Sequence, residues 1–302
     1  MELDVPHNAG VIRATDLARL FSPAQIRSAV RGGALVRVRR GSYVDPAIWS
    51  TLTDAQKHVV LMRAMAADAT SPPVFAADSA GVLWGLADGR GTPFVTVLSE
   101  PQAGGRSHAG IRRLTRRAVM TEPLIRHGLR CTGLARTALD MAAARPFPRA
   151  VAVLDIARRR GVEPSALAGE LVVSDWPRHV RRAVELSTPL SDSPGESEAR
   201  AVIHLRGFAA PELQREFRDR DGVMRVDFFW PEQGVVGEFD GKAKYTRDEF
   251  TAGDPSAVVW REKRREDRLR RQIREVVRFS TAEVRDPPRL RRLLLEAGVP
   301  CG

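Results

Sequence analysis

The pattern of apolar and polar positions near the amino terminus predicts two short helices. The first covers 11–21, where apolar residues recur at helical spacing. The residues expected on its buried side are Ile12, Leu17, Leu20 and Phe21. Ser22-Pro-Ala-Gln25 has the form of a capping box with proline in the first helical position, which predicts that a second helix begins at Pro23. This helix is amphipathic as far as Arg31, and Gly32-Gly33 ends it.

Two short segments of alternating pattern follow within 34–44, and they predict a β-hairpin around the basic turn Arg39-Arg40-Gly41. Helix, turn, helix and basic hairpin is the order of a winged helix-turn-helix. The second helix would enter a major groove and the turn would bind phosphate. The residues predicted to contact DNA are Arg27, Ser28, Arg31, Arg37, Arg39 and Arg40. A winged helix that binds protein is the alternative.

The middle of the chain is predicted to be rich in α-helix. Helices are expected over 54–69, 78–86, 132–142 and 147–160, and strands over 93–98 and 111–117. Arg136 and Asp140 are four residues apart, which predicts an ion pair on a helix surface. The histidines lack metal-ligand spacing and are interpreted as structural or exposed: His58, His108, His127 and His179. Proline, serine and glycine are concentrated in 187–195, which predicts a linker.

Carboxylates interrupt two apolar strands in the carboxy-terminal third, at Arg225 to Trp230 and Val235 to Lys242. Glu238 and Asp240 are two residues apart and leave the same face of their strand. Asp227 can lie beside them if the strands pair as a hairpin. Burying carboxylates without a cation is too costly, so the pattern predicts Mg²⁺ or Mn²⁺ bound by Asp227, Glu238 and Asp240. The alternative is that arginines neutralise these acids.

The segment 257–273 is predicted to be an arginine-rich helix. Val258, Leu269 and Ile273 define its apolar stripe, and Glu262 and Glu266 fall inside that stripe. The strand residue Arg225 or a bound metal ion would supply their partners. A solvated helix held by ion pairs along its own surface is the alternative.

Composition supports a partner that is a nucleic acid or an anionic surface. The 302 residues carry a formal net charge of +11, with a pI near 10.8, and arginine supplies most of the excess. The two cysteines, Cys131 and Cys301, predict neither a disulfide framework nor a zinc site. Neither a signal peptide nor a membrane span is visible, so we expect a cytoplasmic protein without a membrane partner. The absence of a glycine-rich phosphate loop predicts that the protein uses no nucleotide cofactor.

From about Gly195 to Gly298, Asp227 and the run Glu238-x-Asp240-Gly241 resemble the motif of the restriction-endonuclease-like PD-(D/E)XK superfamily, most closely near the very-short-patch-repair endonucleases. The resemblance implies that Asp227 and Glu238 hold a divalent metal and that Glu198, on the preceding helix, is an auxiliary acid. The superfamily usually has lysine where this chain has Asp240. Lys242 is the implied substitute, and Lys244 and Lys263 are alternatives. The implied activity is metal-dependent hydrolysis of a DNA phosphodiester.

The amino-terminal segment resembles the winged-helix domain of AbiEi-type antitoxins, which repress their own operons, and the middle region resembles the part that follows it in those proteins. This implies DNA as a partner, with a cognate toxin or a homodimer partner as further candidates. An alternative function is therefore a non-enzymatic, antitoxin-like transcriptional regulator with a degenerate nuclease fold. A third is RNA processing.

The expected fold class is α+β, with three domains. They are a winged helix-turn-helix over 5–50, an α-rich middle region over 51–187, and a restriction-endonuclease-like α/β domain over 188–302 with a mixed sheet flanked by helices.

Overall fold

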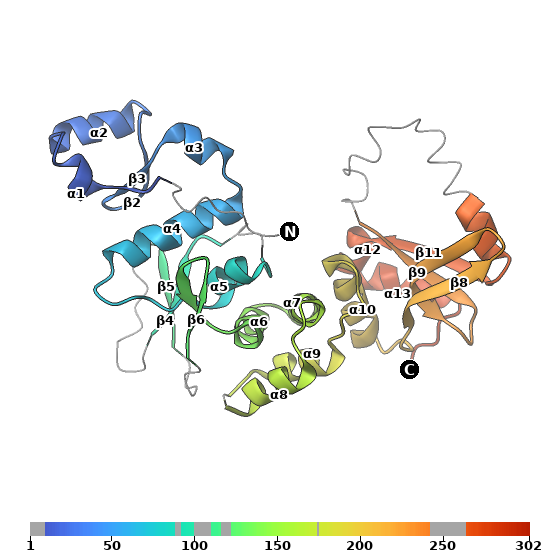
Figure 1. Ribbon diagram of the computed structural model, residues 1–302. Helices are drawn as coiled ribbons and strands as arrows, with labels where there is room; N and C mark the ends of the chain where they lie inside the picture. Colours follow the sequence, from blue (N-terminus) through green and yellow to red (C-terminus); the bar gives the residue numbers. More distant parts are fainter. Residues whose placement is uncertain (1–9, 88–91, 100–109, 116–121, 174, 242–263) are drawn as a thin grey trace. The chain divides into compact units, whose positions relative to one another are not determined.

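The structure is a computed structural model that describes residues 10–87, 92–99, 110–115, 122–173, 175–241 and 264–302. It is a mixture of helices and small sheets, as expected from the sequence (Figure 1). The chain forms two compact units. The first combines 1–144 with 162–177, and the second combines 145–161 with 178–302.

The first unit begins with a three-stranded antiparallel sheet and two helices. The strands have the order β1 (Ile12–Arg13), β3 (Ser42–Val44) and β2 (Val36–Arg39). The helices between them are α1 (Ala14–Leu17) and α2 (Pro23–Arg31), and α3 (Pro46–Thr51) follows the hairpin.

The first predicted helix is shorter than the pattern indicated. Ile12 pairs with Tyr43 in the sheet, so the chain enters α1 from an extended conformation. Leu20 and Phe21 follow α1 and are 78% and 47% exposed, so their assignment to a core was wrong. Helical periodicity could not show that a strand would take the first residues of this segment.

The capping box of α2 is present as predicted. Ser22 Oγ accepts the backbone N–H of Gln25, and Gln25 Oε1 accepts the backbone N–H of Ser22. Ile26 is the buried residue of α2, whereas its basic residues are exposed. Gly33 follows with φ of 76°, a conformation that glycine adopts without strain and that ends the helix.

The rest of the first unit contains further helices and two small sheets. The helices are α4 (Asp54–Asp68), α5 (Ala77–Trp84), α6 (Leu134–Ala143) and α8 (Pro164–Val173). Strands β4 (Val95–Leu98) and β5 (Ile111–Leu114) are parallel, and β6 (Leu124–Arg126) and β7 (Leu129–Cys131) are antiparallel. The bounds of α4, α5, α6, β4 and β5 lie within a few residues of the predicted ones, whereas α8 and the hairpin of β6 and β7 were not predicted.

Arg136 and Asp140 pair as predicted, at 3.1 Å, but the pair is buried and not on a helix surface. The Arg136 guanidinium also lies 3.9 Å from Glu170 of α8 and over the ring of Trp176. Because α8 covers this face of α6, the ion pair is enclosed. His58 is also buried and bonds Ser79 Oγ at 2.8 Å, which agrees with a structural role.

The second unit is built on a four-stranded mixed sheet with the order β11-β10-β9-β8. The strands are β8 (Glu212–Asp219), β9 (Gly222–Trp230), β10 (Val235–Asp240) and β11 (Glu275–Ser280). β10 is antiparallel to β9 and parallel to β11. The helices are α7 (Phe147–Arg159), α9 (Arg178–Leu186), α10 (Pro194–Leu205), α12 (Thr281–Arg285) and α13 (Pro287–Glu296).

Each face of this sheet has its own apolar cluster. Val235 and Phe239 of β10 pack on one face with apolar residues of α10, α12 and α13. Val236, which points to the opposite face, packs with Leu269 of the helical segment 264–270. The sheet therefore has helices on both faces.

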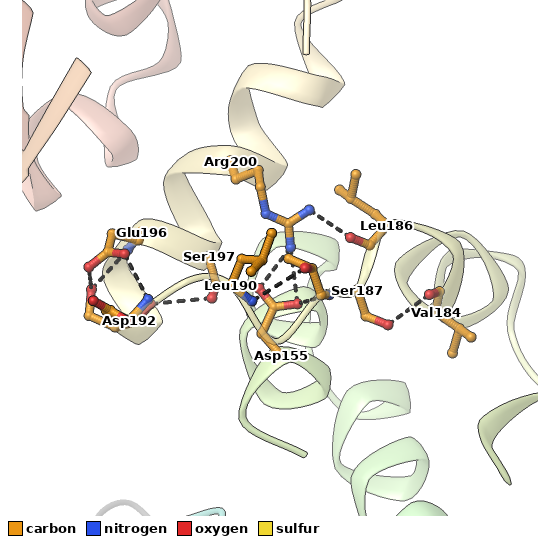
Figure 2. A network of polar contacts seen from close by, with 11 residues as sticks. Asp155, Val184, Leu186, Ser187, Leu190, Asp192, Glu196, Ser197 and Arg200 are labelled. Atoms are coloured by element: carbon orange, nitrogen blue, oxygen red, sulfur yellow. Dashed lines mark hydrogen bonds and ion pairs between the residues drawn. The ribbon is translucent and has the colours of Figure 1, made fainter. Parts of the chain in front are cut away.

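The segment 187–195 is not an open linker, because it is bonded into the second unit (Figure 2). Asp155 of α7 accepts the backbone N–H of Thr188 at 2.8 Å and binds Arg200 of α10 through both carboxylate oxygens, at 3.0 and 2.7 Å. Arg200 also donates to the carbonyl oxygen of Leu186 at 2.6 Å. The second unit consequently includes α7 and α9, which the sequence pattern had grouped with the middle region.

Candidate functional site

Strands β9 and β10 bring the predicted acids to one end of the sheet. Their antiparallel pairing runs from Val235–Trp230 to Gly237–Phe228 and stops before Glu238 and Asp227 would pair. At that point Asp227 Oδ2 accepts the backbone N–H of Phe239 at 2.8 Å. Beyond Gly237, the side chain of Asp227 therefore provides the hydrogen bond between β9 and β10 in place of a backbone carbonyl group.

Glu238 and Asp240 lie on the same face of β10, as predicted from their spacing. Arginines neutralise both of them. Glu238 is 5% exposed, and Arg265 donates to it at 2.9 Å and also to the carbonyl oxygen of Arg225 at 2.8 Å. Asp240 lies 3.9 Å from Arg278 of β11. For Glu238 and Asp240 the structure therefore contains the alternative arrangement, in which arginines neutralise the acids.

Asp227 interacts instead with Glu196, near the start of α10. Glu196 is buried, and burial followed by the charge of Asp227 raises the pKa of its carboxyl group. Its partners are neutral donors, namely Ser193 Oγ at 2.7 Å, the backbone N–H of Asp192 at 2.8 Å and Gln214 Nε2 at 3.0 Å. In the described part of the chain, no arginine or lysine pairs with Asp227 or Glu196.

Gln214 holds Glu196 from strand β8, in an unusual backbone conformation. Its φ is 53°, in the left-handed region, which costs a non-glycine residue energy and is seen mainly where surrounding contacts enforce it. The neighbouring pairs Leu213–Phe228 and Arg215–Val226 bracket it, so Gln214 lies across the ladder from Asp227. Side chains from α10, β8 and β9 thus converge on one place.

Of the remaining predicted site residues, those that the structure describes do not join this group. Glu198 is half-buried on α10, two residues after Glu196 and therefore about 200° around the helix. Lys242, Lys244, Lys263 and Glu262 lie outside the described residues. Glu266 pairs with Arg270 and Arg278, at 2.8 and 3.3 Å, and Arg225 pairs with Asp192, so the expected partnership of Arg225 with Glu266 was wrong.

Among the described residues, no three acids, histidines or cysteines lie close enough together to hold a metal ion. The predicted trio of Asp227, Glu238 and Asp240 is therefore not assembled as a complete ligand set in this part of the chain. Asp227 and Glu196 are close enough for the charge of Asp227 to act on Glu196, and Glu238 immediately precedes Phe239, whose backbone N–H Asp227 accepts.

The residues predicted to bind DNA lie on α2 and on the hairpin of β2 and β3, both in the first unit. On α2 the side chains of Arg27, Ser28 and Arg31 are exposed, whereas Ile26 is buried. Arg37 and Arg40 are exposed on the hairpin and Arg39 is half-buried. A pocket of about 360 Å³ lies beside the turn and is lined by Arg13, Ala14, Thr15, Arg39, Arg40, Gly41 and Asp68. Arg13 pairs with Asp68 there at 3.2 Å.

Sequence reasoning did not identify Glu196 or Gln214 as site residues. Glu196 was visible only as one of two acids at a helix start, a position that acids favour for the helix dipole alone. Gln214 carries no charge and belongs to no spacing motif. Only the pairing of β8 with β9 places it beside the acids.

No protein-family model matches the chain. It is similar to two proteins of Mycobacterium tuberculosis, the uncharacterized protein MT2308 of strain CDC 1551 / Oshkosh and the uncharacterized protein Rv2248 of strain ATCC 25618 / H37Rv. Each is 29% identical over 250 residues, which cover 78% of this chain and 87% of the relative. The crystal structure of the RV2827C protein from Mycobacterium tuberculosis matches with a TM-score of 0.41 and 15% identity, over 69% of this chain and 83% of that one.

No helix among the described residues is both long enough and apolar enough to cross a membrane.

Proposed function

We propose that the chain is a DNA-binding protein whose second unit hydrolyses DNA phosphodiester bonds with Mg²⁺ or Mn²⁺. The observation that carries the proposal is that Asp227 acts on the carboxyl group of Glu196 at the point where the pairing of β9 with β10 stops. In the described part of the chain, only neutral donors bond to these two side chains. Two facing carboxylates without a basic partner repel each other. A hard divalent cation would relieve that repulsion.

The residues fit such a cation in part. Asp227 and Glu196 offer carboxylate oxygens, and Glu238 would offer another if Arg265 released it. A bound Mg²⁺ or Mn²⁺ would activate water and stabilise the charge on the phosphate. Gln214 would keep Glu196 oriented, because its amide donates to Glu196 Oε2.

DNA binding is proposed to rest on the first unit, in the manner of a winged helix-turn-helix. The helices α1 and α2, the basic hairpin and the third strand have the order that this motif requires. The exposed α2 residues Arg27 and Arg31 would contact base edges in the major groove. The turn arginines Arg39 and Arg40, beside the pocket, would contact phosphate.

The nuclease proposal is tested by nicking of supercoiled plasmid in Mg²⁺ or Mn²⁺. The expected result is cleavage by the wild type, loss of cleavage in Asp227→Asn and Glu196→Gln, and retention in Glu198→Gln, a matched loss of charge on the same helix. Wild-type protein that binds the plasmid but leaves it intact with both metals would contradict the proposed hydrolysis.

DNA binding is tested separately, through its dependence on salt. Arg39→Ala with Arg40→Ala should weaken binding to all sequences and lower the slope of log Kd against log salt by about 2, near one for each lost phosphate contact. Arg27→Ala should reduce sequence preference instead. A chelator should leave binding unchanged, because these contacts need no metal ion.

A second candidate function is a non-enzymatic transcriptional regulator. The ion pairs of Glu238 with Arg265 and of Asp240 with Arg278 favour it, because they occupy two of the acids that catalysis would use. This function predicts sequence-specific DNA binding together with no metal-dependent shift in melting temperature. A rise in melting temperature with Mn²⁺ would favour the nuclease, since a ligand that binds the native state stabilises it.

A further inference from the structure

Exposed arginines lie on α7 and α9, two helices of the unit that holds the carboxylates. Arg149 lies near the start of α7, and Arg178 and Arg182 lie one turn apart on α9. All three side chains are exposed, and the two helices pack against each other. We refer to Arg149, Arg178 and Arg182 as the α7–α9 arginines.

Among the described residues, these arginines have no acidic partners. Within the described part of the chain, none of the three forms an ion pair or a hydrogen bond with a carboxylate. The acid of α7, Asp155, is fully buried and is bound by Arg200. Like charges four residues apart, such as Arg178 and Arg182, destabilise a helix. The proximity of Arg178 to Arg182 therefore does not stabilise α9.

One of the three guanidinium groups is held in place by aromatic stacking. The Arg182 guanidinium lies 5.3 Å from the centroid of the Phe147 ring. That ring stacks in turn on His204 of α10, with centroids 6.2 Å apart and planes 28° from parallel. A guanidinium stacked on a ring keeps its in-plane N–H donors available for the oxygens of a phosphate. Ordering it beforehand lowers the entropy lost on binding.

We propose that the α7–α9 arginines bind the backbone phosphates of the duplex DNA on which the second unit acts. These side chains offer positive charge and planar donors, which suit phosphate. Contacts of this kind position DNA without reading its sequence. This inference rests on the proposed DNA-binding function and adds a second surface to it, in the unit that lacks the helix-turn-helix.

The test compares two triple variants of the full-length chain, each with three exposed arginines neutralised. Arg149→Gln with Arg178→Gln and Arg182→Gln should lower the slope of log Kd against log salt for a duplex of unrelated sequence by about 2 to 3. The matched control is Arg285→Gln with Arg291→Gln and Arg292→Gln, on α12 and α13, where the same change in charge should alter the slope by less than one. Circular dichroism checks that both variants are folded.

The outcomes separate this proposal from the proposed function. An equal loss in the control would mean that net charge alone is responsible, and would overturn the proposal. Suppose that the Arg149→Gln, Arg178→Gln and Arg182→Gln variant binds DNA as the wild type does, while Arg39→Ala with Arg40→Ala abolishes binding. This result would overturn the proposal for the α7–α9 arginines and leave the proposed DNA binding by the first unit standing. A wild type that fails to bind duplex DNA would overturn both. Loss of binding to phosphatidylserine vesicles with unchanged DNA binding would assign the surface to an anionic membrane and overturn the proposal.

Discussion

The carboxylates of the second unit differ in what neutralises them. Glu238 and Asp240 lie beside arginines, whereas Asp227 and Glu196 accept hydrogen bonds only from neutral donors in the described part of the chain. Removing a carboxylate charge therefore has opposite effects on stability in the two pairs. At Glu238 it leaves Arg265 without its acidic partner, whereas at Asp227 it relieves the repulsion with Glu196.

Asp227→Asn is expected to leave the apo protein as stable as the wild type or more stable. Asparagine keeps an oxygen that can accept the backbone N–H of Phe239 and removes the charge that acts on Glu196. Asp227→Ala also loses the hydrogen bond and should cost about 1 kcal/mol. Urea unfolding measures both variants. A destabilised Asp227→Asn, with a stability no better than that of Asp227→Ala, would show that the charge itself is needed.

The buried carboxyl of Glu196 should make the second unit less stable as the pH rises. Its pKa is raised in the folded state, by burial first and by Asp227 second, so the folded chain holds this proton more tightly than the unfolded chain does. Stability is then fully present below the unfolded pKa of about 4.3 and is lost as pH rises through the folded value. Unfolding measured from about pH 4 to 7 should show this decline in the wild type and a smaller one in Glu196→Gln.

His58 should make the first unit less stable in acid. Burial lowers its pKa, with Asp78 acting in the opposite direction. The unfolded chain therefore binds a proton below about pH 6.5 that the folded chain resists, and stability falls as the pH drops below that value. His58→Gln should reduce this dependence. His127→Asn, at a turn position with φ of 50°, is the control and should preserve it.

At the scale of single elements, the start of α10 is positioned by contact with β10. A Cβ added at Gly195 would lie 2.1 Å from Cε1 of Phe239, so the helix can approach the strand this closely only with glycine there. Glu196 is the next residue. The position of this acid near Asp227 consequently depends on how α10 packs on the sheet.

Gly195→Ala is expected to destabilise the second unit by about 1–3 kcal/mol, because the core beside Phe239 would be overpacked. It should also weaken any metal-dependent shift in melting temperature by displacing Glu196. The control is Gly169→Ala in α8, where nothing lies within 4 Å and alanine should stabilise the helix by about 0.5–1 kcal/mol. Equal effects of the two substitutions on thermal unfolding would contradict this account.

The elements that could be predicted are those whose signals are local. The capping box of α2, the basic turn of the first hairpin and the common face of Glu238 and Asp240 each depend on residues a few positions apart. The prediction for 11–21 failed because a distant strand, β3, pairs with Ile12. Local periodicity carries no information about that partner.

At the scale of the whole chain, the buried pair of Asp155 and Arg200 joins α7 to α10 within the second unit. The two side chains are almost inaccessible to solvent, and Asp155 also accepts the backbone N–H of Thr188. Proline and serine in 187–195 indicated a linker, but the backbone N–H groups of Thr188 and Asp192 in this segment donate to Asp155 and to Glu196.

Asp155→Ala should strongly destabilise the second unit, by about 3–5 kcal/mol, because it leaves Arg200 buried without its partner. The first unit does not contain this pair and should unfold as in the wild type. Differential scanning calorimetry of the full chain checks this, with the exposed Glu185→Ala as control. A variant in which both units lose stability equally would show that the two unfold together.

Composition, spacing and capping, read from the chain alone, were enough to predict the mixture of helices and strands, the bounds of α2 and the strands that carry Asp227 and Glu238, since each follows from residues close in sequence. The tertiary contacts had to supply the rest. They brought Glu196 and Gln214 to Asp227, gave Glu238 and Asp240 arginine partners, buried Arg136 with Asp140, and grouped α7 with α10. Each of these depends on strand register or helix packing between segments far apart in sequence, which local patterns do not encode.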